Sequence, residues 1–184
     1  DINGDTKEAL APGEEGVVVL DRTPFYAESG GQVGDYGQLL LGENRFVVKD
    51  TQISGDQRLH IGSMSEDSVS SIAAGAEISA TVDEQIRRKT QANHSATHLM
   101  HAALRTVLGD HVQQKGSLVN DEKLRFDFSH TGPVSAAQLQ KIEAFGRDKG
   151  CCKITLEVLD GNIAAQKAKL NNITAAHDAL LLPA

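Results

Sequence analysis

A long stretch without glycine or proline constrains this chain more than any other feature of its sequence. It begins at Asp83 and Glu84, acidic residues suited to a helix N-terminus, and continues to Leu108, directly before Gly109. Acidic residues at the start and a glycine after the end are typical of an α-helix. The pattern therefore predicts one long helix near the middle of the chain.

Histidines are concentrated on this predicted helix, in the segment NHSATHLMH over residues 93–101. At about 100° per residue, His94, His98 and His101 share one face, and an apolar stripe occupies the other. Imidazoles at positions i and i+4 lie one turn apart and can hold one zinc ion. We therefore expect His94 and His98 as zinc ligands, and His101 as a group that hydrogen-bonds a ligand.

Other interpretations of the histidine pair remain open. Such a pair also occurs on ordinary polar helix surfaces. A metalloprotease is disfavoured, because Ser95 occupies the position of the glutamate in HExxH. A zinc site needs at least one more protein ligand, and the candidates are Cys151, Cys152 and His177. Adjacent cysteines are also commonly small core residues.

The flanking regions predict a mixed fold. Short apolar segments separated by turn residues indicate a small barrel or a curled sheet before residue 82, with strands expected at 16–20, 38–41, 45–48, 59–61 and 77–82. After the helix we expect a hairpin over 112–129, a helix over 133–149 with Ser135 as its cap, a strand over 153–159, and helices over 162–171 and 174–182. The fold class is thus α+β, with a β-rich, barrel-like subdomain over 1–82 and an α+β subdomain over 83–184.

Composition excludes several classes of protein. No apolar run approaches the length of a membrane span, so we expect no contact with a membrane. The 18 Lys and Arg against 25 Asp and Glu give a net charge of −7, so any contact with nucleic acid should be local. Two adjacent cysteines favour a reducing compartment, and we expect the cytoplasm. The N-terminus resembles neither a signal peptide nor a native start, and we expect an excised piece.

Three blocks together resemble the editing domain of bacterial alanyl-tRNA synthetase. They are DRTPFYAESGGQVGD at 21–35, NHSATHLMHAALR at 93–105, and QKGSLV with LRFDF at 114–128. The FYAESGGQ block favours the alanyl type and its free-standing relatives over threonyl-tRNA synthetases, which share the HxxxH helix. The resemblance implies hydrolysis of the ester in tRNA(Ala) mischarged with serine or glycine, an error that a pocket for alanine cannot prevent by binding alone.

The resemblance also implies a zinc site that this chain contains only in part. In the family the two HxxxH histidines, here His94 and His98, are joined by a Cys and a His from a downstream Cys-Gly-Gly-Thr-His motif. That motif is absent from this sequence. We therefore expect a chain truncated before the motif.

Other site residues follow from the first block. The family places its threonine near the bound amino acid, which assigns to Thr23 a hydroxyl for the serine side chain. Gly30 and Gly31 permit close approach of a substrate to the backbone, and Gln32 can donate and accept hydrogen bonds. An ordinary turn is the alternative for all four. We assign neither Glu28 nor Asp35 as a general base.

A small basic rim could hold the phosphates at the 3′ end of the tRNA. Its members are Arg87, Arg88 and Lys89 on the predicted helix together with Lys115, although a solvated helix face explains them somewhat better. Most affinity for tRNA would then come from the remainder of the synthetase chain. The alternatives to an editing enzyme are a noncatalytic tRNA-binding or inert fragment, and an unrelated zinc hydrolase.

Overall fold

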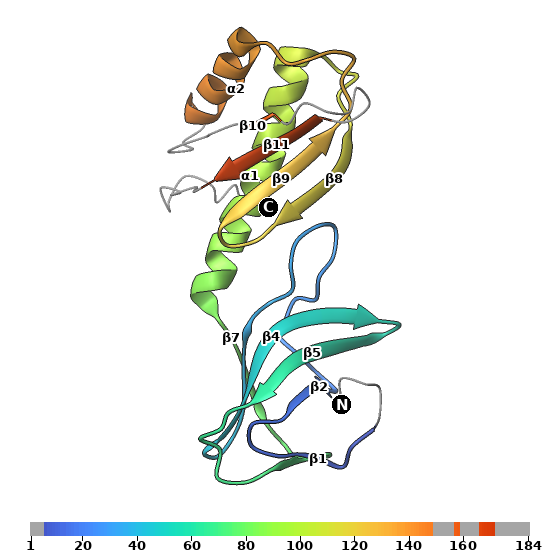
Figure 1. The fold of residues 1–184 in the computed structure, drawn as a ribbon, viewed down its shortest axis with the longest axis vertical. Coiled ribbons are helices and arrows are strands. Elements are labelled where there is room, and N and C mark those ends of the chain that lie inside the picture. The colour runs from blue at the N-terminus through green and yellow to red at the C-terminus, as the bar shows by residue number, and fades with distance from the viewer. Residues whose placement is uncertain (1–5, 149–156, 159–165, 172–184) are drawn as a thin grey trace. The chain divides into compact units, whose positions relative to one another are not determined.

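The protein folds as two compact units, each with its own hydrophobic core. The structure, a computed structural model, describes residues 6–148, 157–158 and 166–171. Unit 1 consists of Asp1–Ser29 and Val33–Arg87, and unit 2 consists of Gly30–Gln32 and Arg88–Ala184. Antiparallel sheets and two helices make the protein an α+β fold, as predicted (Figure 1).

Unit 1 contains a five-stranded antiparallel sheet in the order β2-β5-β4-β3-β7. Its strands are β2 (Glu15–Val19), β3 (Gly37–Leu41), β4 (Asn44–Ser54), β5 (Gln57–Met64) and β7 (Ser79–Val82). A two-stranded ladder joins β1 (Ala9–Leu10) to β6 (Ile72–Ala73). Alternate residues of the strands, such as Phe46 and Val48 in β4, are buried in the core with Phe25, Leu39 and Met64.

The sheet of unit 1 is open, so the barrel that was one of the two expected alternatives does not form. In the described part of the chain its edge strands β2 and β7 pair only with β5 and β3, and not with each other. A β-bulge lies between Val48 and Asp50 of β4, and bulges bend the strand that carries them. The structure thus excludes a closed barrel among the described strands, and the curled sheet stays a prediction.

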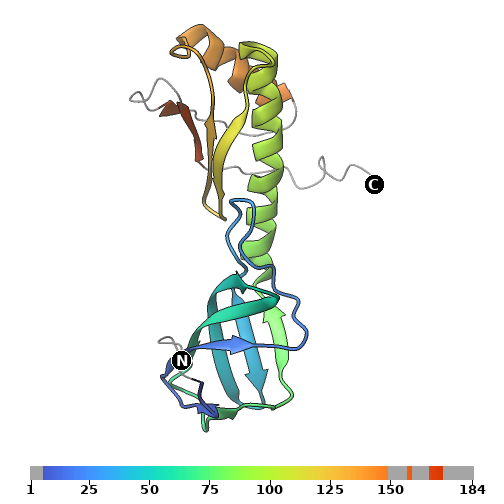
Figure 2. The same ribbon diagram turned by 90° about the vertical axis from the view of Figure 1, so that its right-hand side faces the viewer.

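Unit 2 packs helices against one face of a second antiparallel sheet. The elements are α1 (Glu84–Leu108), whose first residues belong to unit 1, then β8 (Gln114–Val119), β9 (Lys123–Phe128), α2 (Ala136–Asp148), β10 (Glu157–Val158) and β11 (Gln166–Asn171). The strand order is β10-β11-β9-β8. Figure 2 shows α1 running along the β8–β9 hairpin. Met100 and Leu104 of α1, Phe126 and Phe128 of β9, and Ile142 of α2 form one buried core.

The predicted long helix, hairpin and second helix all form. The helix expected over 162–171 is wrong in its second half, because β11 occupies Gln166–Asn171 and pairs with β9. Alternation of Lys167 and Lys169 with Ala168 and Leu170 suits a strand, and the free edge of β9 offers it a ladder. The expected helix over 174–182 and most of the strand over 153–159 lie outside the described residues. Neither helix in the described part of the chain has the length and apolarity of a membrane crossing.

Candidate functional site

The helix that carries the candidate zinc ligands is defined at both ends. Asp83 caps α1, because its Oδ1 accepts the backbone N–H groups of Gln85 and Ile86 at 3.0 Å each. At the other end Gly109 has a φ of 116°, and its N–H donates to the carbonyl of Arg105. The side chains between these caps therefore occupy fixed faces of one helix.

His94 and His98 lie side by side on α1. Their ring centroids are 5.1 Å apart, and the ring planes are inclined by 56°. His98 is exposed, whereas His94 is half-buried and its Nδ1 is shielded from solvent without a hydrogen-bond partner in the described structure. Buried polar atoms almost always have a partner. The Nδ1 atom of His94 is therefore a candidate for binding a ligand that the protein itself does not supply.

His101 lies at the border between the histidine face and the core. Its ring packs on Phe126 with centroids 5.2 Å apart, and its Nε2 is also buried without a partner in the described structure. The buried face of α1 extends further toward His101 than the apolar stripe suggests, because polar side chains join it. Asn93 donates to the carbonyl of Asn120 at 2.6 Å, and Thr97 donates to the carbonyl of Asn93 at 3.0 Å. The role of His101 as partner of a ligand stays a prediction.

Contacts within unit 2 bring the segment Gly30–Gln32, which we call the GGQ segment, to the same end of β8 as the helix α1 that carries the histidines. Gln32 forms a parallel bridge with Val119, the last residue of β8. The next residue, Asn120, accepts the hydrogen bond from Asn93, which directly precedes His94. Two motifs that are about 60 residues apart in the sequence therefore share one end of a strand.

The two predicted glycines have different surroundings. Gly31 has a φ of 86°, and a Cβ added to it would lie 2.3 Å from the hydroxyl oxygen of Ser117 and 2.5 Å from its carbonyl oxygen. The carbonyl of Gly31 accepts the N–H of Val119 at 2.7 Å, and the Ser117 hydroxyl donates to the carbonyl of Gly30 at 3.2 Å. Gly30 has a φ of 60° and open space around it. The close approach at Gly31 is therefore to β8, and Gly30 faces solvent.

The side chain of Gln32 is half-buried and makes no hydrogen bond within the described structure. Lys115 is exposed at the register irregularity between Gln114 and Gly116 of β8, and it has no ion-pair partner among the residues described. Both groups are thus available to a ligand. The predicted roles of Gln32 in the site and of Lys115 as a phosphate contact stay predictions.

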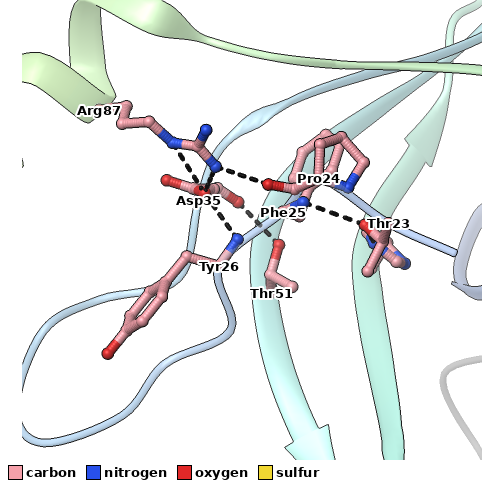
Figure 3. A network of polar contacts seen from close by, with 8 residues as sticks. Thr23, Pro24, Phe25, Tyr26, Asp35, Thr51 and Arg87 are labelled. Carbon is pink, nitrogen blue, oxygen red and sulfur yellow. Dashed lines mark hydrogen bonds and ion pairs between the residues drawn. The ribbon is translucent and has the colours of Figure 1, made fainter.

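Thr23 belongs to unit 1, where its hydroxyl is largely committed. His60 is fully buried, and its Nδ1 donates to the carbonyl of Val18 at 2.9 Å, which leaves Nε2 as acceptor for the Thr23 hydroxyl at 2.8 Å. The Thr23 oxygen also accepts the N–H of Phe25 at 3.1 Å (Figure 3). Burial lowers the pKa of His60. The Thr23 oxygen can therefore accept one further hydrogen bond but has no proton left to donate.

Asp35 and Arg87 form a nearly buried ion pair in unit 1 (Figure 3). The Oδ2 of Asp35 accepts the N–H of Tyr26 at 2.7 Å and two donors of Arg87, Nε at 3.2 Å and Nη2. Arg87 Nη2 also donates to the carbonyl of Pro24 at 2.7 Å. The hydrogen bond to Asp35 raises the pKa of the Arg87 guanidinium. Arg87 thus already has protein partners, and its predicted contact with tRNA phosphate stays a prediction.

The sequence did not predict two arrangements of histidines, namely the buried His60 and the stacked pair His111 and His130. His60 is buried within a strand whose other residues gave no signal of a polar core. His111 and His130 stack with centroids 5.1 Å apart, and the Nε2 of His111 lies 2.9 Å from the Nδ1 of His130. Burial, followed by the charge of His111, lowers the pKa of His130. No spacing in the sequence signals either arrangement, because the partners come from separate elements.

The described residues contain no group of three His, Cys, Asp or Glu side chains that could hold a metal ion. The other candidate ligands, Cys151, Cys152 and His177, lie outside the described residues. Among the residues that the structure describes, the predicted ligands His94 and His98 therefore have no third candidate ligand beside them.

Comparison with known proteins shows which proteins this chain is similar to. A family model described as tRNA synthetases class II (A) matches residues 2–86. The alanine–tRNA ligase of Pseudomonas fluorescens is 54% identical over 140 residues, which are 76% of this chain. This chain is homologous to part of alanine–tRNA ligase. The alanine–tRNA ligase of Hydrogenovibrio crunogenus is 51% identical over 162 residues, or 88% of this chain.

The homology covers only part of each alanine–tRNA ligase. The chain spans 16% of the length of the Pseudomonas fluorescens relative and 18% of that of Hydrogenovibrio crunogenus. The alanine–tRNA ligase of Acidovorax, at 55% identity over 143 residues, is likewise matched over 16% of its length. The similarity to alanine–tRNA ligases agrees with the resemblance seen in the sequence motifs.

Proposed function

We propose that this chain is the editing part of an alanine–tRNA ligase and hydrolyses the ester that joins serine or glycine to tRNA(Ala). The observation that carries the proposal is the pair of adjacent imidazoles on α1 at the end of β8 to which Gln32 is bridged. The homology to alanine–tRNA ligases supplies the context. A pocket for alanine cannot exclude glycine by size and rejects an added hydroxyl only about a hundredfold, so hydrolysis at a second site is useful.

His94 and His98 fit two positions of a zinc site. Their rings are adjacent, and the Nδ1 atom of His94 is buried with no partner in the described structure. A zinc ion held there would polarise the ester carbonyl or lower the pKa of a bound water. Catalytic zinc sites use about three protein ligands. At least one further ligand is therefore needed, and Cys151 and Cys152 are candidates within this chain.

Gln32 and Thr23 are our candidates for contacts with the reacting end of the substrate. The free amide of Gln32 can donate to the ester carbonyl and accept from the α-amino group. Thr23 would accept the hydrogen of a serine hydroxyl, since its own proton goes to His60. Gly30 would let the aminoacyl end approach the backbone, because among the described residues no atom outside Gly30 and its chain neighbours lies within 4 Å of the position that a Cβ would occupy.

Partners follow from the same proposal. Lys115, and Arg87 through N–H groups not used within unit 1, would contact phosphates at the 3′ end of tRNA(Ala). The net charge of −7 makes a wide basic footprint implausible, so the remainder of the ligase chain would supply most of the affinity. Such an enzyme would act in the cytoplasm.

A noncatalytic module is the second candidate, and one observation favours it. The described residues hold only two imidazoles of the expected metal set and no third ligand beside them. A chain that cannot retain zinc would bind the aminoacyl end of tRNA without cleaving the ester.

The test is release of serine from seryl-tRNA(Ala) by the chain with added zinc. We expect zinc-dependent release, lowered about a hundredfold or more in His94→Ala, since loss of a ligand removes the metal-dependent chemistry. His111→Ala, an exposed histidine of unit 2, is the matched control and should leave the rate unchanged. Zinc-independent background release by all three proteins would refute the enzyme and support the noncatalytic module.

A further inference from the structure

The loop that carries Gln32 is closed at its base by two residues of unit 1. The N–H of Asp35 donates to the carbonyl of Tyr26 at 2.9 Å, and the N–H of Tyr26 donates to Oδ2 of Asp35 at 2.7 Å. Thr51 supports both sides, because its hydroxyl donates to the carbonyl of Asp35 and its own carbonyl accepts the N–H of Glu28, both at 2.8 Å. The chain between 26 and 35 therefore leaves and returns at one fixed point.

Arg87 locks this base to the start of α1. Its guanidinium donates to Oδ2 of Asp35 and to the carbonyl of Pro24, so one side chain holds the segments before and after the loop (Figure 3). The planar fork of arginine can bind both acceptors at once, which a lysine cannot do. The Asp35 side chain is 8% exposed and that of Arg87 is 25% exposed, so solvent screens the pair only weakly.

The loop itself needs such a base. It contains three glycines, at 30, 31 and 34, and glycine-rich chain has many accessible conformations unless its ends are held. At its tip a few contacts reach β8, namely the hydrogen bonds to the carbonyls of Gly30 and Gly31 and the bridge of Gln32 with Val119. The ring of Tyr26 points away from the ion pair (Figure 3), and its hydroxyl donates to the carbonyl of Ser29 within the loop at 3.2 Å.

We infer that Asp35 and Arg87 are positioning residues, which fix the loop so that Gln32 is presented to the substrate. The inference rests on the proposed function for its catalytic consequence, but its structural content does not. Arg87 stands seven residues, about two helical turns, before His94. The residue that closes the base of the loop and the imidazole pair are thus carried by the same helix, α1.

The kinetic test separates positioning from phosphate binding. In Arg87→Met we expect kcat for seryl-tRNA(Ala) hydrolysis to fall about 10- to 100-fold, because a misplaced catalytic group lowers the rate of the chemical step. Loss of the proposed phosphate contact alone would raise KM and leave kcat unchanged. Arg87→Lys should recover part of the loss, and Asp35→Asn combined with Arg87→Met should be no worse than Arg87→Met alone, because the two residues act as one unit. The control is Lys141→Met, which removes an exposed charge on α2. A raised KM at unchanged kcat in Arg87→Met would overturn positioning in favour of phosphate binding.

Amide hydrogen exchange tests whether Arg87 holds the loop in place, and it does not require the chain to have hydrolytic activity. Arg87→Met should speed exchange of the Tyr26 amide and of the Val119 amide, which donates to Gly31, by about tenfold or more, while the amides of β5 stay protected. If the chain hydrolyses nothing, the proposed function fails and exchange still tests the loop. Unchanged exchange at Val119 overturns the inference. If Arg87→Met loses protection throughout, Arg87→Lys, which retains the charge, provides the same comparison.

Discussion

Two clusters of polar side chains in this protein differ in how far their hydrogen-bonding capacity is used. In unit 1 both nitrogens of the buried His60 are bonded, and Oδ2 of Asp35 accepts three hydrogen bonds. On α1 of unit 2, the Nδ1 of His94 and the Nε2 of His101 are buried without partners in the described structure. Saturated groups stabilise a fold, whereas unsaturated buried groups indicate a place for a ligand. Whether a buried polar group has a hydrogen-bond partner therefore distinguishes structural residues from candidate ligand-binding residues better than the residue type does.

The most severe test of this comparison removes the unsaturated pair. His94→Ala with His98→Ala should abolish zinc binding and leave the thermal unfolding temperature in the absence of zinc nearly unchanged, because neither ring has a hydrogen bond to lose. Metal content after dialysis, measured by atomic spectroscopy, checks this expectation. His111→Ala with His130→Ala is the control, and it should retain the zinc. Unchanged zinc content in the first variant would eliminate the ligand assignment.

Removing the saturated histidine should have the opposite effect. His60→Ala leaves the Thr23 hydroxyl and the Val18 carbonyl unpaired and opens a cavity, so we expect a loss of about 3 kcal/mol in the free energy of unfolding. Chemical denaturation measures the loss. His98→Ala, on an exposed site, should cost little by comparison. A smaller loss for His60→Ala than for His98→Ala would break the comparison.

The adjacent residues Gly30 and Gly31 of the GGQ segment allow a comparison of the free energy of unfolding between a position in open space and one packed against β8. Gly31→Ala should destabilise the protein by about 3 kcal/mol, because it combines a left-handed backbone with overlap of the Ser117 backbone. Gly30→Ala should cost only about 1 kcal/mol, since its φ is also positive but space around it is open. Denaturant titrations of both variants provide the measurement. Equal costs would mean that the tip does not pack on β8 as described.

The smallest effect concerns pH. Because burial lowers the pKa of His60 below 6.5, the unfolded chain binds more protons than the folded one in mildly acidic solution. Stability should thus be complete above pH 6.5 and decline as the pH falls below it, by at most about 1.4 kcal/mol per pH unit for one proton. His60→Gln should flatten this slope. His130→Gln should remove a smaller part, because the pKa of His130 is also lowered but its ring is less buried.

Local patterns were sufficient to predict much of the fold. The extent of α1, its Asp83 cap and the β8–β9 hairpin follow from features within a few residues of each other. Ser135 caps α2 as expected, with its hydroxyl accepting the N–H of Gln138 at 3.3 Å. The length of β4 and β5 was underestimated, because buried polar residues such as Thr51 and His60 interrupt their apolar alternation.

Long-range pairings could not be predicted in the same way. The Thr23–His60 bond joins residues 37 apart, and the contacts of Arg87 with Asp35 join residues 52 apart. Such pairs depend on the strand order of unit 1, which no local pattern specifies. The histidine pair was accessible because a helix repeats every three to four residues. Its placement beside the GGQ segment required the β8 edge, which only the three-dimensional structure supplies.

The short bridge of Gln32 with Val119 has a further consequence for the behaviour of the protein in solution. Among the strands that the structure describes, β8 is the outer one of its sheet, and an outer strand with unpaired N–H and C=O groups can recruit a strand from another molecule. The Gly30–Gln32 segment covers the end of that strand by accepting the Val119 N–H. Gly30 and Gln32, which we propose to contact the substrate, thus belong to a segment that also protects the end of β8 from pairing with another molecule. A chain that lacks this segment would be expected to aggregate more readily.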